Sequence, residues 1–453
     1  MNSRLAFASI TELAALLASA EISAVELVNC YADRIDKLDP KVKAYISLDL
    51  ERARSNAGST TKFENPLTGI PYACKDLFDV AGIATTGGSR VLENNIAESD
   101  AIVISRLNQS GAIYLGKNNL HEFAYGATGE NVVYGTPPNP YDSSRLAGGS
   151  SSGSAAAVSH GLCTFALGTD TGGSVRAPAA LCGLVGFKPT FGRISTEGVL
   201  PYSWTLDHVG SLTRSAADAA IVFDALADQS LHCDKSVDGL RIGIPQQFFY
   251  EHCDAEIITA MNQLKQLLQD AGAELMPVSM PSMEHTRTVS LTVQMPEALS
   301  YHNRYLEEHG ELYSQDFRAG LALGQCLLAE QYIRAKRFVE SYRREMDRVF
   351  DDVDCLLTPA TPTIAPKIGS VSVDIDGYLE PAGNAITRYT SFFNMTGHPA
   401  ITFPCAMHSQ GLPMGAQLIG KHYQDEALLA LTQQIESLIF ESQIGVIPKP
   451  DID

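Results

Sequence analysis

Two neighbouring loops rich in glycine and serine decide how this chain is interpreted. The first reads Gly148-Gly149-Ser150-Ser151-Ser152-Gly153-Ser154, and the second reads Gly168-Thr169-Asp170-Thr171-Gly172-Gly173-Ser174. Each leads into a run of small residues that favours a helix. Glycine permits backbone conformations that other residues resist, and consecutive backbone N–H groups at such a turn attract negative charge. The loops therefore predict a site for either a bound phosphate or a transient oxyanion.

Composition narrows the class of protein and its partners. The chain has 453 residues, of which 45% are hydrophobic and 19% charged, values typical of a globular protein with a sizeable core. Its net charge of −19 disfavours nucleic acid and anionic membranes as partners. No apolar run approaches the roughly 20 residues that a membrane helix needs, and we expect no signal peptide at residues 1–6. We therefore expect a cytoplasmic protein.

Cysteine and histidine usage points away from disulfides and metals. The nine cysteines are an odd number and form no C-x-x-C pair, so buried reduced thiols are expected. The eleven histidines show no H-x-x-x-H or H-E-x-x-H spacing. We expect no metal and no other cofactor, and activity that survives chelators.

Strand-like and helix-like segments alternate along the chain, which predicts an α/β layered fold with a largely buried sheet. The expected helices are two within 9–37 and those at 102–109, 216–226, 257–271 and 331–350. The expected strands are 70–75, 112–116, 163–168, 240–244, 274–278 and 354–357. No linker is evident, so one domain over 1–453 is expected. Residues 281–350 lack strand signals and are expected to form a helical insertion or lid.

Two local motifs in the first loop are incomplete. Gly148 and Gly153 give the G-x-x-x-x-G frame of a phosphate loop, but Ser154 stands where that motif requires lysine. The same stretch fits the G-x-S-x-G nucleophile elbow with Ser151 as nucleophile, but the strand that must precede it is missing. Asp207-His208 would be its tempting partner pair, and we interpret that pair as structural.

A third interpretation combines both loops with an earlier lysine. Lys75 closes the apolar stretch Gly69-Ile70-Pro71-Tyr72-Ala73-Cys74. A buried lysine tends to lose its proton, and a neutral lysine can act as general base for a serine. A lone lysine at the end of a strand is usually a surface residue, so this segment alone does not decide between the three interpretations.

Taken together, the segments resemble the amidase signature family. The matching segments agree in order and spacing, and they are 69–76, 117–126, 148–154, 168–174, 182–190, 394–400 and 411–415. The resemblance covers most of the chain and is densest between Gly69 and Arg214. It implies an α/β/α sandwich with a large mixed central sheet, and an enzyme that hydrolyses carboxylic amides.

The resemblance also implies a catalytic triad. Ser174 falls on the family's nucleophile, Ser150 on the bridging serine and Lys75 on the base, with a cis peptide bond between Gly149 and Ser150. In this scheme Lys75 accepts a proton from Ser174 through Ser150, and the relay returns it to the leaving nitrogen, which an amide needs because an amide anion leaves poorly.

Backbone groups of the second loop complete the implied site. The expected oxyanion hole consists of the N–H groups of Thr171, Gly172, Gly173 and Ser174. Asp170 and Arg176 flank the nucleophile with opposite charges. An ion pair that braces the loop is the favoured interpretation of these two residues, and binding of a substrate carboxylate by Arg176 is the alternative.

Aromatic residues border the pocket in relatives. Phe123, Tyr125, Tyr202 and Trp204 lie in the corresponding segments and predict a partly aromatic site for an apolar acyl or aryl group. Ordinary core aromatics are the competing interpretation. The expected partner is a small-molecule amide, with a homodimer left open.

The family also contains the glutamine-hydrolysing component of a tRNA-dependent amidotransferase, which is the alternative function. That component carries an aspartate before its Asn-x-x-Gly motif. This chain reads Thr387-Arg388-Tyr389 there, which favours a free-standing amidase.

Overall fold

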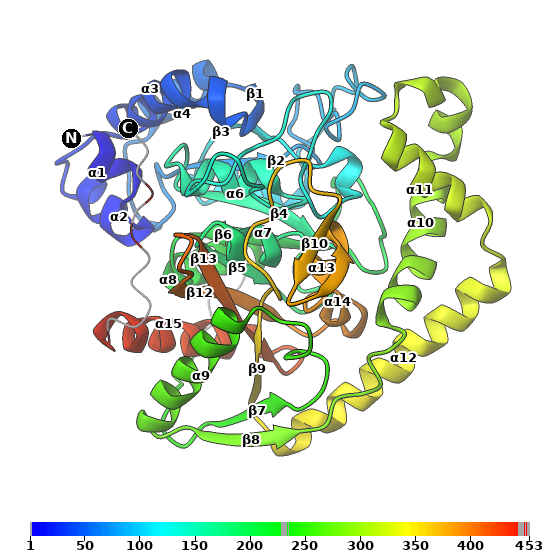
Figure 1. Cartoon of the computed structure of the whole chain (residues 1–453). Coiled ribbons are helices and arrows are strands. Elements are labelled where there is room, and N and C mark those ends of the chain that lie inside the picture. The colour runs from blue at the N-terminus through cyan, green and yellow to red at the C-terminus, as the bar shows by residue number, and fades with distance from the viewer. Residues whose placement is uncertain (1, 228–232, 234, 443–447, 449, 451–453) are drawn as a thin grey trace.

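The computed structural model of the chain describes residues 2–227, 233, 235–442, 448 and 450. Within them, no helix combines the length and apolarity that crossing a membrane requires. Helices surround a central sheet, and a long helical segment runs along one side (Figure 1). All nine cysteines are free thiols, and seven are buried. Cys326 is exposed and Cys233 is half-buried, so the expectation of buried thiols holds for most of them.

Eleven strands form one mixed sheet. In spatial order they are β1 (Tyr45–Leu48), β3 (Ile113–Asn118), β2 (Pro71–Lys75), β4 (Phe165–Asp170), β6 (His208–Thr213), β5 (Val185–Lys188), β12 (Ala400–Met407), β13 (Pro413–Gly420), β9 (Cys355–Pro359), β7 (Arg241–Pro245) and β8 (Glu274–Val278). Strand β2 runs parallel to β3 and β4, and β7 runs parallel to β8 and β9. The other pairings are antiparallel. This confirms the expected mixed sheet.

Besides the sheet, the described residues form fifteen α-helices, two short 3-10 turns and a separate hairpin. The helices outside the helical segment are α1 (Asn2–Ala6), α2 (Ile10–Ala18), α3 (Ala24–Val42), α4 (Leu50–Ser59), α5 (Ile102–Gln109), α6 (Ser152–Ser159), α7 (Arg176–Leu181), α8 (Ala216–Ala227), α9 (Ala255–Asp270), α13 (Ala382–Thr387), α14 (Phe392–Thr396) and α15 (Asp425–Ser442). One 3-10 turn is Glu122–Ala124, and the hairpin joins β10 (Ser372–Ile375) to β11 (Tyr378–Pro381). Helices α2 and α3 begin at capping boxes formed by Ser9 and Ser23.

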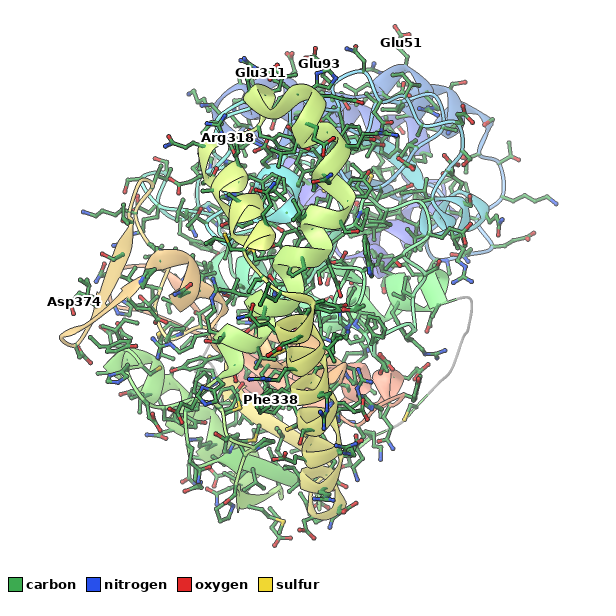
Figure 2. All side chains as sticks on the ribbon, turned by 90° about the vertical axis from the view of Figure 1, so that its right-hand side faces the viewer. Glu51, Glu93, Glu311, Arg318, Phe338 and Asp374 are labelled. Atoms are coloured by element: carbon green, nitrogen blue, oxygen red, sulfur yellow. The ribbon has the colours of Figure 1, made fainter. Side chains whose placement is uncertain are left out.

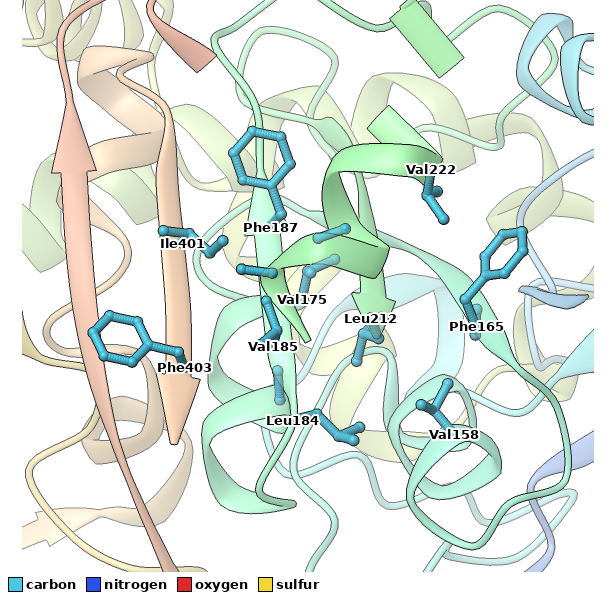
Figure 3. Packing of buried hydrophobic residues seen from close by; sticks show 14 of the residues in the cluster. Val158, Phe165, Val175, Leu184, Val185, Phe187, Leu212, Val222, Ile401 and Phe403 are labelled. Atoms are coloured by element: carbon cyan, nitrogen blue, oxygen red, sulfur yellow. The ribbon is translucent and has the colours of Figure 1, made fainter. Parts of the chain in front are cut away.

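Consecutive residues of β5 show that helices cover both faces of the sheet. A Cβ atom on Gly186 would lie 2.6 Å from the Ala179 Cβ atom of α7, so that helix lies directly against one face. The neighbouring Phe187 packs edge-on against Phe223 of α8, with ring centroids 5.4 Å apart. Neighbouring strand residues point to opposite faces. Figure 3 shows Phe187 within this buried core. The α/β/α sandwich is therefore confirmed.

Residues 281–350 contain no strand, and all of them are described. They form α10 (Thr286–His309), a 3-10 turn (Gly310–Leu312), α11 (Gln315–Gln325) and α12 (Ala329–Asp352). These helices stand together on one side of the molecule, facing the viewer in Figure 2. An aromatic cluster joins the segment to the turn at Phe123, whose ring centroid lies 4.4 Å from that of His302 and 5.5 Å from that of Phe317.

Candidate active site

The predicted catalytic loops meet at the carboxyl ends of two neighbouring strands of the sheet. Lys75 is the last residue of β2, and Asp170 is the last residue of its parallel neighbour β4. Ligand sites of α/β sheets lie at the carboxyl ends of such strands. The loop before α6 brings Ser150 to the same strand ends, because Ser151 donates its backbone N–H to the Ser174 carbonyl at 3.3 Å.

Lys75 is fully buried and contacts Ser150, the predicted bridging serine. Its Nζ atom lies 2.6 Å from Ser150 Oγ and 2.8 Å from Thr169 Oγ1. Burial lowers the pKa of Lys75 to about 7, although Asp207 and Asp170 oppose this shift. A lysine with this pKa is neutral in a large fraction of molecules near neutral pH, so it has a lone pair that can accept a proton.

The peptide bond between Gly149 and Ser150 is cis, as predicted. Backbone hydrogen bonds hold the bond on both sides. Gly149 donates its N–H to the Ala127 carbonyl at 2.7 Å, and the Ser150 carbonyl accepts from the His121 N–H at 3.1 Å. Lys75 and Ser150 are thus joined side chain to side chain, whereas Ser174 is joined to this loop through the main chain. Among the described contacts, no hydrogen bond links the hydroxyls of Ser150 and Ser174.

The predicted nucleophile loop, residues 168–174, requires glycine beside Ser174. Gly173 has a φ of +127°, and a Cβ atom there would lie 1.9 Å from Thr390 Oγ1. The Gly173 N–H donates to Asp170 Oδ1 at 2.8 Å, so this group is committed to the loop and not to the expected oxyanion hole. The N–H groups of Thr171, Gly172 and Ser174 have no protein partner within the described residues.

Asp170 and Arg176 form the ion pair that was favoured for bracing this loop. Both side chains are fully buried, with two nitrogen–oxygen contacts of 2.9 and 3.1 Å. Burial alone would raise the pKa of Asp170, but Arg176 outweighs it and holds the pKa well below its usual range. Arg176 also donates to Gln417 at 2.7 Å and to Asn394 at 2.6 Å. It does not line the cavity at Ser174, so its assignment to the substrate pocket is corrected.

A cavity of about 310 Å³ opens at Ser174. Tyr125 and Tyr202 line it, as expected, together with Thr171 and Gly172 of the nucleophile loop. Phe123 does not line it, because this residue is 2% exposed and packs into the aromatic cluster with His302. Trp204 does not line the cavity either, and this residue is 46% exposed at the surface. Both residues were predicted to line the pocket because they lie close in sequence to Tyr125 and Tyr202, which do line it.

The helical segment supplies the part of the cavity that the motifs did not indicate. Its lining residues are Arg287, Leu291, Gln294 and Met295 from α10 and Asp316 and Leu323 from α11, joined by Thr387 and Ser391. The apolar periodicity of these helices predicts where they are buried, but it holds no signal that a particular side chain reaches a distant loop.

Asp207 and His208 brace the nucleophile loop from outside the cavity. The Asp207 carboxylate accepts from Thr171 Oγ1 at 2.5 Å and from the N–H groups of Tyr202 and Ser203. His208 Nδ1 lies 2.7 Å from the Leu206 carbonyl oxygen, and burial holds its pKa well below the usual value. These contacts support the structural interpretation of the pair.

One group among the described residues has donor atoms arranged so that they could hold a metal ion. Asp347, His398 and His422 each offer one donor atom, all within 4.8 Å of one another. The two imidazole rings stack with centroids 3.8 Å apart. None of the three residues lines the cavity at Ser174. The expectation of metal-free catalysis therefore stays a prediction.

Comparison with known proteins agrees with this geometry. The family model described as Amidase matches residues 26–429. The A subunit of the glutamyl-tRNA(Gln) amidotransferase of Chromohalobacter salexigens is 34% identical over 472 residues, covering 94% of this chain and 96% of that protein. A solved amidase structure has a TM-score of 0.90 at 35% identity, covering 97% of this chain and 100% of its own. A solved structure described as an unexpected vestigial protein complex that reveals the evolutionary origins of an s-triazine catabolic enzyme has a TM-score of 0.90 at 31% identity over the same shares.

The fold, the site and these matches define an amide-hydrolysing enzyme. The chain belongs to the amidase family, whose model it matches over most of its length.

Proposed function

We propose that this enzyme is a free-standing amidase that hydrolyses a small carboxylic amide through an acyl-enzyme on Ser174, with Ser150 and Lys75 as its proton relay. The contact between Lys75 and Ser150 carries the proposal. A fully buried lysine 2.6 Å from a serine hydroxyl, with a pKa of about 7, is an unusual arrangement for a structural lysine. Strongly shifted pKa values in a cleft mark functional groups.

The proposed reaction begins with proton removal. Neutral Lys75 takes the proton of the Ser150 hydroxyl while Ser150 takes that of Ser174, and Ser174 Oγ attacks the amide carbon. Catalytic hydrogen bonds often form only once substrate is bound, so the step between the two serines is expected in the substrate complex. The carbonyl oxygen becomes an oxyanion, which the free N–H groups of Thr171, Gly172 and Ser174 stabilise.

The tetrahedral intermediate then collapses. The relay returns its proton to the amide nitrogen, the C–N bond breaks, and ammonia or an amine leaves while the acyl group stays on Ser174. Water, activated by the same relay, attacks the ester carbon. The carboxylic acid leaves, and Ser174 regains its proton. Every proton that Lys75 accepts is returned within the cycle, so no cofactor is required.

The second candidate is the glutamine-hydrolysing component of a tRNA-dependent amidotransferase, because a protein with an amidotransferase name is 34% identical to this chain. The segment Thr387-Arg388-Tyr389 supports the free-standing enzyme. Arg388 binds Glu380 at 2.5 Å, outside the cavity, while Thr387 lines it.

The free cysteines support the cytoplasm as the location.

Ammonia release tests the proposal. The purified chain is incubated with primary amides that include acetamide, malonamate, benzamide, indoleacetamide, oleamide and glutamine, beside the Ser174→Ala variant. Ser159→Ala is the matched control, because Ser159 lies on α6 away from the cavity. We expect release by the wild type and the control and none by Ser174→Ala. Activity that appears only with partner subunits and tRNA would favour the second candidate.

A further inference from the structure

We propose that the substrate of this amidase carries a carboxylate, which Arg287 and the Tyr202 hydroxyl bind in the catalytic cavity. This inference rests on the proposed function and names its substrate class. This anionic substrate differs from the apolar acyl group that the sequence predicts. The reason is that Arg287, a cation, lines the cavity together with Tyr125 and Tyr202.

Arg287 is a cation without a protein partner. It is the second residue of α10 and lines the same cavity as Ser174. Within the described residues, its guanidinium makes no hydrogen bond or ion pair, and the residue as a whole is exposed. Surrounding protein lowers its pKa through desolvation, while Tyr202, Tyr125 and Glu380 raise it.

The nearby acidic groups are already bound elsewhere. Glu380 accepts from Arg388 at 2.5 and 3.0 Å and does not line the cavity. Asp316 lines the cavity, but its carboxylate accepts from Ser314 Oγ at 2.6 Å and pairs with His121 Nε2 at 3.0 Å. The positive charge of Arg287 is therefore left for a ligand.

Tyr202 provides an independent indication of an anion. Its side chain is 3% exposed, it lines the cavity, and its hydroxyl has no hydrogen-bond partner within the described residues. A buried hydroxyl without a partner loses the hydrogen bonds that it makes to water. The phenol and guanidinium can both donate hydrogen bonds. A carboxylate offers two oxygens, one for each donor.

The start of α10 adds to the positive potential. The first turn of this helix has no acidic residue, and its N-cap, His285, makes no side-chain capping bond. The N-terminal end of a helix carries partial positive charge and disfavours cations nearby. The positive charge of Arg287 is thus unfavourable at this end of α10. A bound carboxylate would neutralise both that charge and the partial positive charge of the helix end.

The cavity size limits the substrate to a short chain. At about 310 Å³ it lies near the small end of ligand pockets, which span roughly 300–1,000 Å³. The amide at Ser174 and the carboxylate at Arg287 share this volume. The half-amide of a short dicarboxylic acid, such as malonamate, succinamate or glutaramate, has this chemistry.

Paired substrates test the inference. Values of kcat and KM are measured for succinamate and for isocaproamide, in which an isopropyl group replaces the carboxylate. The shorter malonamate and the longer glutaramate show which distance between amide and carboxylate the cavity prefers. The wild type, Arg287→Met and Tyr202→Phe are compared. Arg304→Met is the matched control, because this arginine lies on the same helix but not at the cavity.

We expect the wild type to prefer one of the anionic amides. Arg287→Met should raise KM for that amide about tenfold to a hundredfold, the effect of losing a charged hydrogen bond, and should not raise KM for isocaproamide. Tyr202→Phe should act in the same direction more weakly, and Arg304→Met should have no effect. Equal loss on both substrates, or no loss in Arg287→Met, would overturn the inference.

The inference and the proposed function fail in different ways. Hydrolysis of isocaproamide without preference for any half-amide would reject the carboxylate site alone. Hydrolysis of no amide by the wild type would reject the proposed function. In that case, binding of succinate to the wild type but not to Arg287→Met, measured by calorimetry, would still support the anion site, and equal binding would reject it.

Discussion

At the scale of single residues, the proposed relay depends on keeping Lys75 unprotonated. Burial lowers the pKa of this amine from its ordinary 10.5 to about 7, whereas Asp170 and Asp207 pull it upward. The balance keeps the amine able both to take a proton from Ser150 and to give it back. Were the lysine always charged, it could not accept the proton that Ser174 must lose.

The pH dependence of activity follows from this balance. Protonated Lys75 is inactive as a base, so kcat/KM should rise with pH up to about 7, the pKa of Lys75, and level off above it. Each pH unit below that value should cost about tenfold. Kinetics over this range with a neutral amide such as isocaproamide check the slope, and a flat profile would exclude lysine as the base.

Removing the amine should cost far more than removing another partly desolvated lysine. Lys75→Met should lower kcat about 10²–10⁴-fold, the usual contribution of a general base. Lys265→Met is the matched control, because burial also lowers the pKa of Lys265, which lies outside the cavity. Thermal unfolding of both variants would show that the fold is retained. Comparable kinetics for the two variants would contradict the proposed relay.

Gly173 is predicted to tolerate no side chain. A Cβ atom there meets Thr390 Oγ1 and requires a backbone conformation that favours glycine. We expect Gly173→Ala to displace the loop and lower kcat at least about a hundredfold. Gly192→Ala controls for the backbone alone, since its φ is +77° but its Cβ atom would meet nothing within 4 Å. Full activity of Gly173→Ala would show that the loop geometry is not needed.

At the scale of elements, two parallel strand ends and one helix start create the site. Strand β2 delivers Lys75, β4 leads into the nucleophile loop, and the loop before α6 delivers Ser150. The resemblance to the amidase signature family predicts these three pieces, whereas the local motifs alone left three interpretations open. The sequence does not predict that α10 delivers Arg287, because an amphipathic pattern shows a buried face and not its neighbour.

The ion pair at the end of β4 should stabilise the fold as well as the loop. Arg176→Met leaves Asp170 buried and uncompensated, which typically costs about 3–5 kcal/mol. The free energy of unfolding in urea measures this cost. Arg334→Met is the control, because its ion pair with Glu330 is exposed and should change the free energy by at most about 1 kcal/mol. Equal stability of the two variants would argue against the brace.

The same pair sets a dependence of stability on pH. The pKa of Asp170 is lower in the folded protein than in the unfolded chain. Its stabilising contribution is therefore complete above the unfolded pKa of about 4 and is lost as the pH falls below it. The urea midpoint of the wild type should decrease more steeply below this pH than that of Arg176→Met.

At the scale of the whole molecule, the fold class was predictable and the sheet order was not. Strands with apolar runs, such as β7 and β8, follow from the sequence. Strands β5, β6, β12 and β13 were not predicted, although they form the middle of the sheet. Glycine, serine and threonine occupy much of β6, where helices approach closely, so its hydrophobic signal is weak.

The eleven-stranded sheet supports our proposal that the chain is one domain. Its strands come from every part of the described chain, from β1 to β13, and the only other sheet among the described residues is the two-stranded hairpin of β10 and β11. The helices of residues 281–350 lie beside this sheet and provide one wall of the cavity. Whether they also act as a lid remains a prediction.

Metal removal should leave the enzyme unchanged. The proposed relay needs no Lewis acid, and the group formed by Asp347, His398 and His422 does not line the cavity. We expect full ammonia release after treatment with EDTA and after the substitution His422→Ala. A loss of activity in EDTA that added metal restores would contradict a metal-free mechanism.

Covalent labelling of the nucleophile tests the central claim most directly. The enzyme is treated with a fluorophosphonate, and the modified peptide is mapped by mass spectrometry over a range of pH. We expect one adduct on Ser174, a labelling rate that falls below pH 7 as Lys75 is protonated, and almost no labelling of Lys75→Met. An adduct on another serine, or labelling at an undiminished rate in Lys75→Met, would contradict the central claim.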